Sequence, residues 1–220
     1  RGCHSASVVG TKIYIFGGQG RKRRFNDLHV FDTQQHKWET VLASGPTPKP
    51  RNSHSAAVIG KNIYIYGGYD GSSLLNDMFI FDTETQSWSA AKTKEGNAPP
   101  KCSAHTSCAV DGKLYLFGGR DGTRCYNDIF VFDPPTSTWT KPDVTGEKPV
   151  PVYRLKAAVL RHRFIVFVGG FDEVKCSNST YMYDTLKKNW QPIHVRGPLP
   201  EPSCYHATAV ISNEVYLLGG

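Results

Sequence analysis

The stretch that decides the fold is "IYIYGGYDGSSLLNDMFIFDTETQSW", residues 63–88, in which an apolar run ends at a double glycine and a second apolar run leads to a tryptophan. The same pattern returns along the chain. All four tryptophans, Trp38, Trp88, Trp139 and Trp190, follow the second glycine of a pair by 20 residues. The double glycines recur every 50 or 51 residues, at 17–18, 67–68, 118–119, 169–170 and 219–220. This fixed period predicts a repeat architecture rather than one irregular domain.

Each repeat contains four short segments that are separated by turn residues. In the second repeat these segments are residues 54–59, 63–66, 78–81 and a shorter piece around Trp88. Glycine and asparagine in the intervening "GKN" can adopt the positive φ angles of tight hairpin turns. Since no apolar period of 3.6 residues is present, the pattern predicts four antiparallel strands in each repeat.

The composition of the strands predicts how the sheets are arranged. The second strands, "IYIF", "IYIY", "LYLF", "FIVF" and "VYLL", are apolar on both faces, so both faces must be covered. The first strands, such as "HSAAVI", carry small residues that suit a crowded position. Sheets stacked around an axis satisfy both conditions. We therefore predict an all-β fold, an incomplete β-propeller of four-stranded antiparallel blades. The expected blades are residues 1–50, 51–101, 102–152 and 153–202, followed by half of a fifth at 203–220.

The repeat resembles the kelch motif over the whole chain. The resemblance lies in the double glycine, the third strand ending in "FD" or "YD", the later tryptophan, and the phrases "NDLHVFD", "NDMFIFD" and "NDIFVFD". It is similar to the variant in Tea-type polarity proteins, the leucine-zipper-like regulator and the Rab9 effector. The resemblance implies a kelch-type β-propeller whose remaining blades and flanking domains belong to the same longer protein. The fourth repeat departs from the pattern, because "CSNSTYMYD" replaces the Asn-Asp phrase and we expect Lys156 at the place of the repeated histidines.

Charge and cysteine content limit the partners and the compartment. The net charge of +7 and the pI near 9.1 favour acidic partners. The basic residues are spread over many loops, and only residues 21–24 form a run, so we do not expect nucleic acid binding. No segment approaches the roughly 18 apolar residues of a membrane-spanning helix, and we expect no membrane insertion. The six cysteines lack a CxxC pair, which indicates free thiols in a reducing compartment. We expect the cytoplasm, with the nucleus as the alternative.

Strand parity predicts where a partner binds. The loops that follow the double glycines and the loops that enter the next blade emerge on the same side, and long loops on a rigid scaffold usually carry binding sites. Arginine together with exposed aromatic residues is the composition of interface hot spots. An acidic segment or a free carboxylate terminus is the expected ligand, and the resemblance implies that this face binds peptides. The predicted partner-binding residues are Arg51, Asn52, Ser53, Tyr69, Asp70, Arg120, Asp121, Arg124, Tyr153, Arg154, Phe171 and Tyr205.

No catalytic or metal site is expected. The matching histidines, His4, His54, His105 and His206, occur once per blade and would be too dispersed to coordinate one metal, so we interpret them as caps of the first strands. The recurring Asn-Asp pairs are interpreted as Asx turns. Glycine-rich phrases such as "GGYDG" lack the context of a phosphate-binding loop. We therefore expect no catalytic residues, no metal and no cofactor.

Two classes of function remain open at this point. The first is a non-catalytic protein-interaction module, for example a substrate adaptor of a ubiquitin ligase or a cytoskeletal or trafficking scaffold. The second is a metal-dependent enzyme, because kelch propellers include copper radical oxidases and specifier proteins. The fold alone does not decide between the two classes. The sequence favours the interaction module, since no residue cluster of either enzyme is visible.

Overall fold

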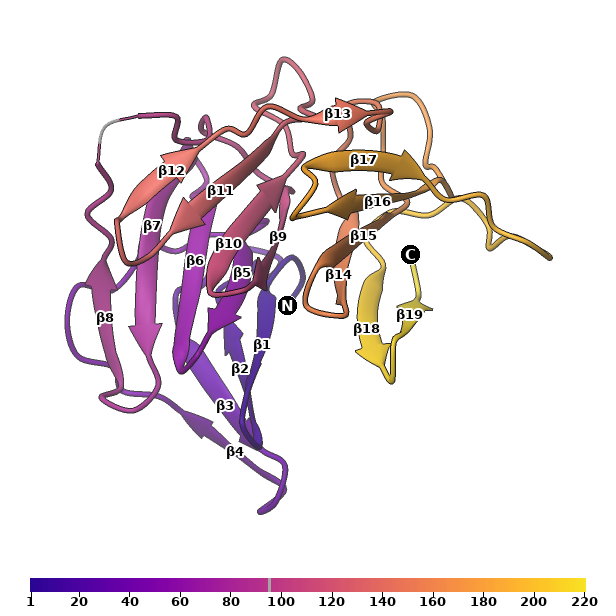
Figure 1. Cartoon of the computed structure of the whole chain (residues 1–220). Helices are drawn as coiled ribbons and strands as arrows, with labels where there is room; N and C mark the ends of the chain where they lie inside the picture. The colour runs from indigo at the N-terminus through magenta and orange to yellow at the C-terminus, as the bar shows by residue number, and fades with distance from the viewer. Residues whose placement is uncertain (95) are drawn as a thin grey trace. The chain divides into compact units, whose positions relative to one another are not determined.

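The computed structural model describes residues 1–94 and 96–220, and every regular element in this part of the chain is a β-strand (Figure 1). The strands fall into two compact units. The first unit comprises Arg1–Lys94 and Pro99–Ser103, and the second comprises Ala104–Gly220 with the residues just before Pro99. Each unit is described by itself below.

Two four-stranded antiparallel sheets build the first unit. The strand order in each sheet follows the order along the chain, so each blade forms from consecutive hairpins. One sheet consists of β1 (Ser5–Val9), β2 (Lys12–Phe16), β3 (Leu28–Asp32) and β4 (Lys37–Thr40). The other consists of β5 (Ser55–Ile59), β6 (Asn62–Tyr69), β7 (Leu74–Asp82) and β8 (Ser87–Ala90).

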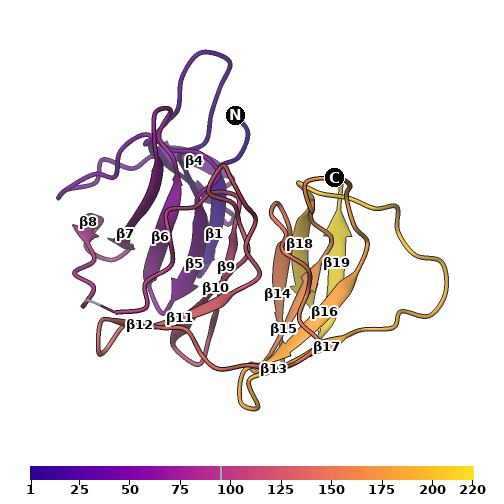
Figure 2. The same ribbon diagram turned by 90° about the horizontal axis from the view of Figure 1, so that it is seen from above.

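The second unit repeats this topology. Its sheets are β9 (Thr106–Val110), β10 (Lys113–Phe117), β11 (Ile129–Asp133) and β12 (Thr138–Thr140); β14 (Lys156–Leu160), β15 (Phe164–Val168), β16 (Thr180–Asp184) and β17 (Asn189–Pro192); and the pair β18 (Ala207–Ile211) and β19 (Glu214–Leu218). Figure 2 shows β14 beside β18, the first strands of consecutive sheets. The predicted all-β fold of four-stranded antiparallel blades is confirmed.

The segment that connects two blades also pairs with the outer strand of the following blade. The short strand β13 (Thr145–Gly146) runs parallel to β17. In the first unit Ser44 forms the same kind of parallel bridge with Ser87, and the Trp88 amide donates to the Ser44 carbonyl oxygen at 2.8 Å. A Cβ atom on Gly45 would lie 2.2 Å from the Trp88 carbonyl oxygen, which explains the glycine at this crossing. Each of these two sheets therefore gains an additional pairing from the preceding connection.

The repeated tryptophan joins neighbouring blades. In the first unit the Trp88 ring lies 5.0 Å from Phe81 of its own blade and 5.0 Å from Phe16 of the preceding blade, measured between ring centroids. In the second unit Trp190 lies 4.9 Å from Phe117 of the preceding blade and 5.1 Å from Phe167 of its own. Tilted aromatic pairs at these distances stabilise beyond the area that they bury. Trp88 and Trp190 therefore each mark a contact between adjacent sheets of their unit.

The double glycines leave room for the residue that precedes each first strand. Gly17 and Gly18 have φ angles of 64° and 91°, which favour glycine. A Cβ atom on Gly68 would lie 2.9 Å from the His54 Cβ, and one on Gly17 would lie 3.0 Å from His54 Cε1. The buried His54 thus packs over the glycines of two consecutive blades, and its Nε2 lies 2.9 Å from the Ser5 hydroxyl. This packing explains why the double glycine and the histidine recur together.

The fourth blade corrects one expectation about this position. β14 begins at Lys156, so the residue in front of the strand is Leu155 and not Lys156. Leu155 is 3% exposed and packs in the histidine position, because Cβ atoms on Gly118 and Gly170 would lie 3.2 Å and 3.0 Å from its side chain. The prediction that Lys156 replaces the histidine was wrong by one residue. A buried apolar residue replaces it, and Lys156 is exposed.

The Asn-Asp pairs connect distant segments instead of forming the predicted turns. In the second blade Arg51 donates from Nη1 to Asp77 Oδ1 at 2.7 Å and from Nη2 to Oδ2 at 2.9 Å. Arg51 Nη1 also donates to the Gly67 carbonyl oxygen at 3.0 Å, and the Arg51 side chain is fully buried. Arg1 and Asp27 form the same bidentate pair in the first blade. We call each such pair the Arg–Asp clamp, which ties the entry of a blade to the start of its third strand.

The clamp predicts the effect of removing Arg51. We expect Arg51→Ala to lower the free energy of unfolding by about 2 kcal/mol, because Asp77 and the Gly67 carbonyl oxygen lose charge-assisted hydrogen bonds. Urea unfolding of the variant measures this loss. Arg21→Ala removes the same charge from an exposed loop and is the matched control. Equal stability of the two variants would contradict a structural role for Arg51.

An ion pair in the second unit predicts acid sensitivity. Arg163 Nε donates to Asp184 Oδ1 at 2.8 Å, and this contact, together with the Lys187 and Leu186 amides, lowers the pKa of Asp184 to about 2. The lowered pKa contributes stability above the ordinary carboxyl pKa of about 3.9, and this contribution is lost as the pH falls through about 2. We expect Asp184→Asn to flatten the loss of stability below pH 4 in urea titrations. An unchanged pH profile in the variant would refute the assignment.

Candidate functional site

The loops that follow the double glycines are organised by aspartates. Asp70 Oδ1 accepts from the Ser72 and Ser73 amides at 2.8 and 2.7 Å. These backbone hydrogen bonds lower the pKa of Asp70 to about 2. Asp121 forms the same turn in the third blade, and hydrogen bonds from Tyr126 and from the loop lower its pKa as well. Both carboxylates therefore hold the predicted binding loops in shape, and their Oδ1 atoms are engaged within the loops.

In the first unit the predicted residues form a connected polar cluster. Asn52 is 7% exposed; its side chain donates to Gln19 Oε1 at 3.0 Å and accepts from Arg24 Nε at 2.9 Å. The Arg24 guanidinium also lies 4.7 Å from the centre of the Tyr69 ring. Ser53 has a φ angle of 54°, and its amide donates to the Cys3 carbonyl oxygen at 2.9 Å. The contribution of Arg24, which lies in the basic run of residues 21–24, was not predicted.

Arg51 has a different surrounding from the other predicted contact residues. Its side chain is fully buried, and its guanidinium is occupied by Asp77 and the Gly67 carbonyl oxygen. A guanidinium held in this way has no free edge for a partner carboxylate. The burial argues against the predicted partner contact, and we leave Arg51 out of the proposed binding surface.

In the second unit five predicted residues come together. Arg120 lies 5.0 Å from the centre of the Tyr153 ring, and Arg154 lies 4.8 Å from Tyr153 and 4.2 Å from Tyr205. Phe171 meets Tyr153 edge to face at 5.5 Å. Arg154 therefore lies against two tyrosine rings. We call Arg120, Tyr153, Arg154, Phe171 and Tyr205 the cation–aromatic ladder.

Backbone hydrogen bonds position the ladder. Tyr153 and Phe171 exchange amide-to-carbonyl hydrogen bonds at 3.1 and 2.9 Å, which pair the entry of the blade with its long loop. The Arg154 amide donates to the Ala104 carbonyl oxygen at 2.8 Å, and the Tyr205 amide donates to the Arg154 carbonyl oxygen at 3.2 Å. Arg154 and Tyr205 have φ angles of 61° and 64°. Consecutive blade entries are thus linked, so equivalent side chains line up from blade to blade.

The charges of the ladder are only partly compensated. Arg120 donates to the Tyr153 hydroxyl at 3.3 Å and to the Gly122 carbonyl oxygen at 3.2 Å. Within the described part of the chain, Arg154 forms no ion pair with an acidic side chain. Arg124, by contrast, lies 3.5 Å from Asp121 and stacks on Tyr126. Arg154 is therefore the ladder cation best placed to receive a carboxylate, whereas Arg124 is engaged within its own loop.

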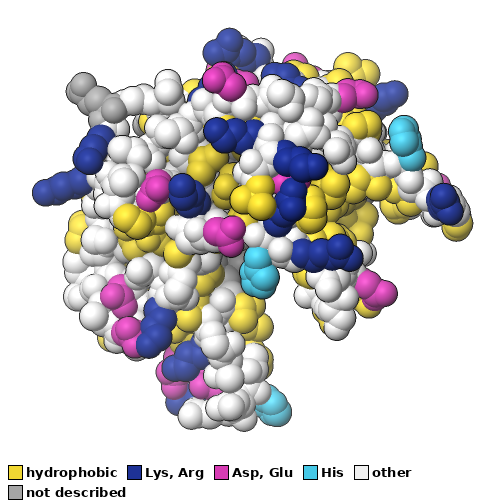
Figure 3. Space-filling view, in the orientation of Figure 1, with side chains coloured by type: hydrophobic (Ala, Val, Ile, Leu, Met, Phe, Trp, Pro, Cys, Tyr) yellow, Lys and Arg dark blue, Asp and Glu magenta, His cyan; other side chains and the backbone are white. Residues whose placement is uncertain are grey.

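On the face that Figure 3 presents, the basic side chains do not gather into one patch. Figure 3 shows Lys and Arg scattered among acidic and apolar side chains on the face that it presents. The local arrangement around Arg154, rather than the total charge, therefore carries the argument for an acidic ligand.

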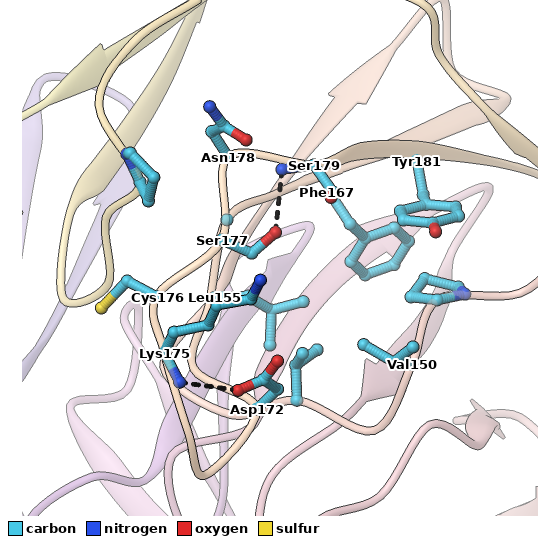
Figure 4. Close-up of a pocket in the computed structure, with 14 residues that line it drawn as sticks. Val150, Leu155, Phe167, Asp172, Lys175, Cys176, Ser177, Asn178, Ser179 and Tyr181 are labelled. Atoms are coloured by element: carbon cyan, nitrogen blue, oxygen red, sulfur yellow. Dashed lines mark hydrogen bonds between the residues drawn. The ribbon is translucent and has the colours of Figure 1, made fainter.

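A cavity marks the fourth blade, where the Arg–Asp clamp is missing (Figure 4). Val152 precedes the Tyr153–Phe171 bridge just as Arg51 precedes the Asn52–Tyr69 bridge, and Ser179 stands before the third strand where Asp77 stands in the second blade. With both charged side chains replaced, a cavity of about 310 Å³ remains. Its walls include Val150, Leu155, Phe167, Tyr181, Asp172, Lys175, Cys176, Ser177 and Asn178.

Two departures in the sequence of the fourth repeat coincide with this cavity. The phrase "CSNST" replaces the Asn-Asp pair, and Val152 stands in place of the arginine, a change that the sequence analysis did not predict. Asn178 keeps the role of its counterparts, because its side chain donates to the Pro200 carbonyl oxygen as Asn127 does to Pro149. The fourth blade therefore retains the asparagine contact but lacks the clamp, as it lacks the histidine that Leu155 replaces.

Among residues 1–94 and 96–220, no group of three or more His, Cys, Asp or Glu side chains lies close enough together to hold a metal ion. No helix of the described chain has the length and apolar character needed to cross a membrane.

Comparison with known proteins gives several related chains, among them a regulator, an effector and an acyl-CoA-binding domain-containing protein. Leucine-zipper-like transcriptional regulator 1 of Homo sapiens is 32% identical over 235 residues, which cover 100% of this chain and 28% of the relative. The Rab9 effector protein with kelch motifs of Bos taurus is 30% identical over 212 residues, covering 95% of this chain and 44% of the relative. Acyl-CoA-binding domain-containing protein 5 of Arabidopsis thaliana is 31% identical over 228 residues, which cover 99% of this chain and 35% of the relative. The chain thus spans less than half the length of these relatives.

The family follows from the repeats and from these matches. The resemblance to kelch repeats rested on the double glycines, the third strands ending in "FD" or "YD" and the later tryptophans, and the structure adds the four-stranded sheets. The model of the KLHDC2/KLHL20/DRC7 Kelch-repeats domain matches residues 3–220, nearly the whole chain. The chain belongs to the kelch-repeat family.

Proposed function

We propose that the chain is a non-catalytic protein-interaction module that binds an acidic segment of a partner protein or peptide at the cation–aromatic ladder. The observation that carries the proposal is Arg154, a cation that lies against the Tyr153 and Tyr205 rings and has no acidic partner among the described residues. A planar guanidinium receives a carboxylate through two parallel hydrogen bonds. Stacking on the rings restricts its side chain before binding, so less entropy is lost when the partner arrives.

The surrounding residues support a peptide-sized ligand. Tyr205 is 56% exposed and offers a rigid aromatic surface beside Arg154. Asn52, Ser53 and Tyr69 are the proposed contacts of the first unit, where Arg24 joins them. Asp70, Asp121 and Arg124 act through the shape of their loops in this proposal. Direct partner contact by Asn52, Ser53 and Tyr69 is part of the proposal.

The relatives support the class of function. Two of them carry the words regulator and effector in their names, which suits a module that binds other proteins. A substrate adaptor of a ubiquitin ligase, or a cytoskeletal or trafficking scaffold, in the cytoplasm or the nucleus, is the biological role that we propose. The remaining blades and flanking domains of a longer protein would complete it.

The proposal predicts the effect of Arg154→Ala. We expect the variant to lose the partners that the unchanged protein captures from cell extract, and to bind an identified partner about tenfold more weakly, since a central charged contact is worth at least about 1.4 kcal/mol. Arg196→Ala removes an exposed charge in the same unit and is the control. Identical capture by the protein and both variants, with folding verified by thermal unfolding, would refute binding at the ladder.

A charge-conserving variant separates stacking from charge. We expect Arg154→Lys to recover only part of the affinity, because lysine keeps the charge but lacks the planar fork that stacks and binds bidentately. Binding by the unchanged protein should also weaken between 50 and 200 mM salt, since exposed charges are screened within about 8 Å near physiological ionic strength. Isothermal titration with the captured partner measures both effects. Full affinity in Arg154→Lys would show that the rings do not contribute.

A further inference from the structure

Two cysteines of the second unit lie next to each other although they are far apart in sequence. Cys176 belongs to the long loop of the fourth blade, and Cys204 belongs to the segment that leads into β18. Their sulfur atoms are 2.8 Å apart, and both residues are free thiols and partly accessible. A disulfide bond has a length of about 2.03–2.05 Å, so the two sulfurs need to approach by less than about 1 Å.

The backbone aligns the two cysteines independently of their side chains. Ser177 and Ser203 form an antiparallel bridge, in which the Ser203 amide donates to the Ser177 carbonyl oxygen at 3.1 Å. In an antiparallel pair the residue before one bridge partner faces the residue after the other. Cys176 and Cys204 are therefore directly opposed, and opposed residues bring their Cβ atoms to about 4.5–5.5 Å, close to the spacing that a disulfide requires.

The same pair of positions is filled differently in other blades. In the first blade Arg24 and Asn52 take these positions and form a hydrogen bond of 2.9 Å between Nε and Oδ1. In the third blade the loop position is Cys125, and the entry position is Tyr153. Side chains at these two positions are therefore in contact after the first and the fourth blade, and only the junction after the fourth blade places cysteine on both sides.

We propose that Cys176 and Cys204 are a reversible disulfide site that fixes the long loop of the fourth blade to the entry of the following blade. The site does not depend on the proposed partner binding. The cysteine pair does lie beside the proposed binding site, because Cys204 directly precedes Tyr205 of the ladder. Cys176 also lines the cavity of the fourth blade. Oxidation would therefore restrain the loop that runs from Phe171 to Asn178.

The chemistry balances with a low-molecular-weight disulfide such as glutathione disulfide as the oxidant. One protein thiol loses its proton and attacks a glutathione sulfur, which forms a mixed disulfide and releases one glutathione. The second protein thiol then displaces the second glutathione and completes the protein disulfide. Two protein thiols are oxidised and one glutathione disulfide is reduced to two glutathione thiols. Burial and the neighbouring Cys176 raise the pKa of Cys204 to about 11, so this thiol is protonated at neutral pH and reacts slowly as the attacking nucleophile.

The test is direct detection of the bond. The reduced protein is equilibrated in glutathione buffers from fully reduced to fully oxidised, free thiols are blocked with an alkylating reagent, and the digested protein is examined by mass spectrometry. We expect one cross-linked peptide that joins Cys176 to Cys204, formed as the buffer becomes oxidising and removed by dithiothreitol. Amide hydrogen exchange should slow in residues 171–178 of the oxidised protein.

Matched variants make the result decisive. Cys204→Ser should abolish the cross-link and leave Cys176 as a mixed disulfide with glutathione, whereas Cys125→Ser, which changes the equivalent loop cysteine of the third blade, should leave the cross-link intact. If a variant fails to unfold cooperatively, pairing in the unchanged protein still decides the question. Separate glutathione adducts on Cys176 and Cys204, without the cross-link, would overturn the proposal. Loss of partner binding in Arg154→Ala would be unaffected by either result, so the two proposals fail separately.

Discussion

The close approach of two backbone segments at each double glycine is the constraint on which the remaining structure depends. The residue before the first strand packs over the glycines of its own blade and of the preceding blade, as His54 does over Gly68 and Gly17. A side chain on either glycine would enter this contact, and their positive φ angles add a second reason for glycine. The aromatic contacts of Trp88 and Trp190 depend on the same spacing, because they bridge sheets that the glycines allow to come together.

The blades differ mainly at positions that do not contact the double glycines. The Arg–Asp clamp is present in the first and second blades and is replaced by Val152 and Ser179 in the fourth, where a cavity remains. The contact between a loop and the next entry is a polar pair in the first blade and a thiol pair after the fourth. The repeats thus share one scaffold, and local substitutions give individual blades different surfaces and chemistry.

The sequence was sufficient for the fold because its signals are periodic. Glycine pairs and tryptophans at a constant spacing predicted the four-stranded antiparallel sheets. It was less informative for single residues. Arg51 and Arg154 stand in similar loop segments, yet one is buried against Asp77 and the other stacks on tyrosines, and only three-dimensional contacts distinguish them. The misplacement of Lys156 by one residue has a similar cause, since Leu155 lacks the polar signal that identified the other strand starts. The opposition of Cys176 and Cys204 depends on backbone register, which composition does not reveal.

The parallel pairing of two blade connections with the outer strands that follow them has a consequence for solubility. The outer strand of a sheet normally exposes unpaired backbone groups that can recruit a strand from another molecule. β17 pairs with β13, and β8 pairs with Ser44 through a single bridge. Part of the outer edge of each of these two sheets is therefore already paired within the chain. Gly45 and Gly146, which pass close to the tryptophan carbonyl oxygens, make this pairing possible. The blade connections that contain these glycines therefore hinder the pairing of strands between molecules and the aggregation that follows from it.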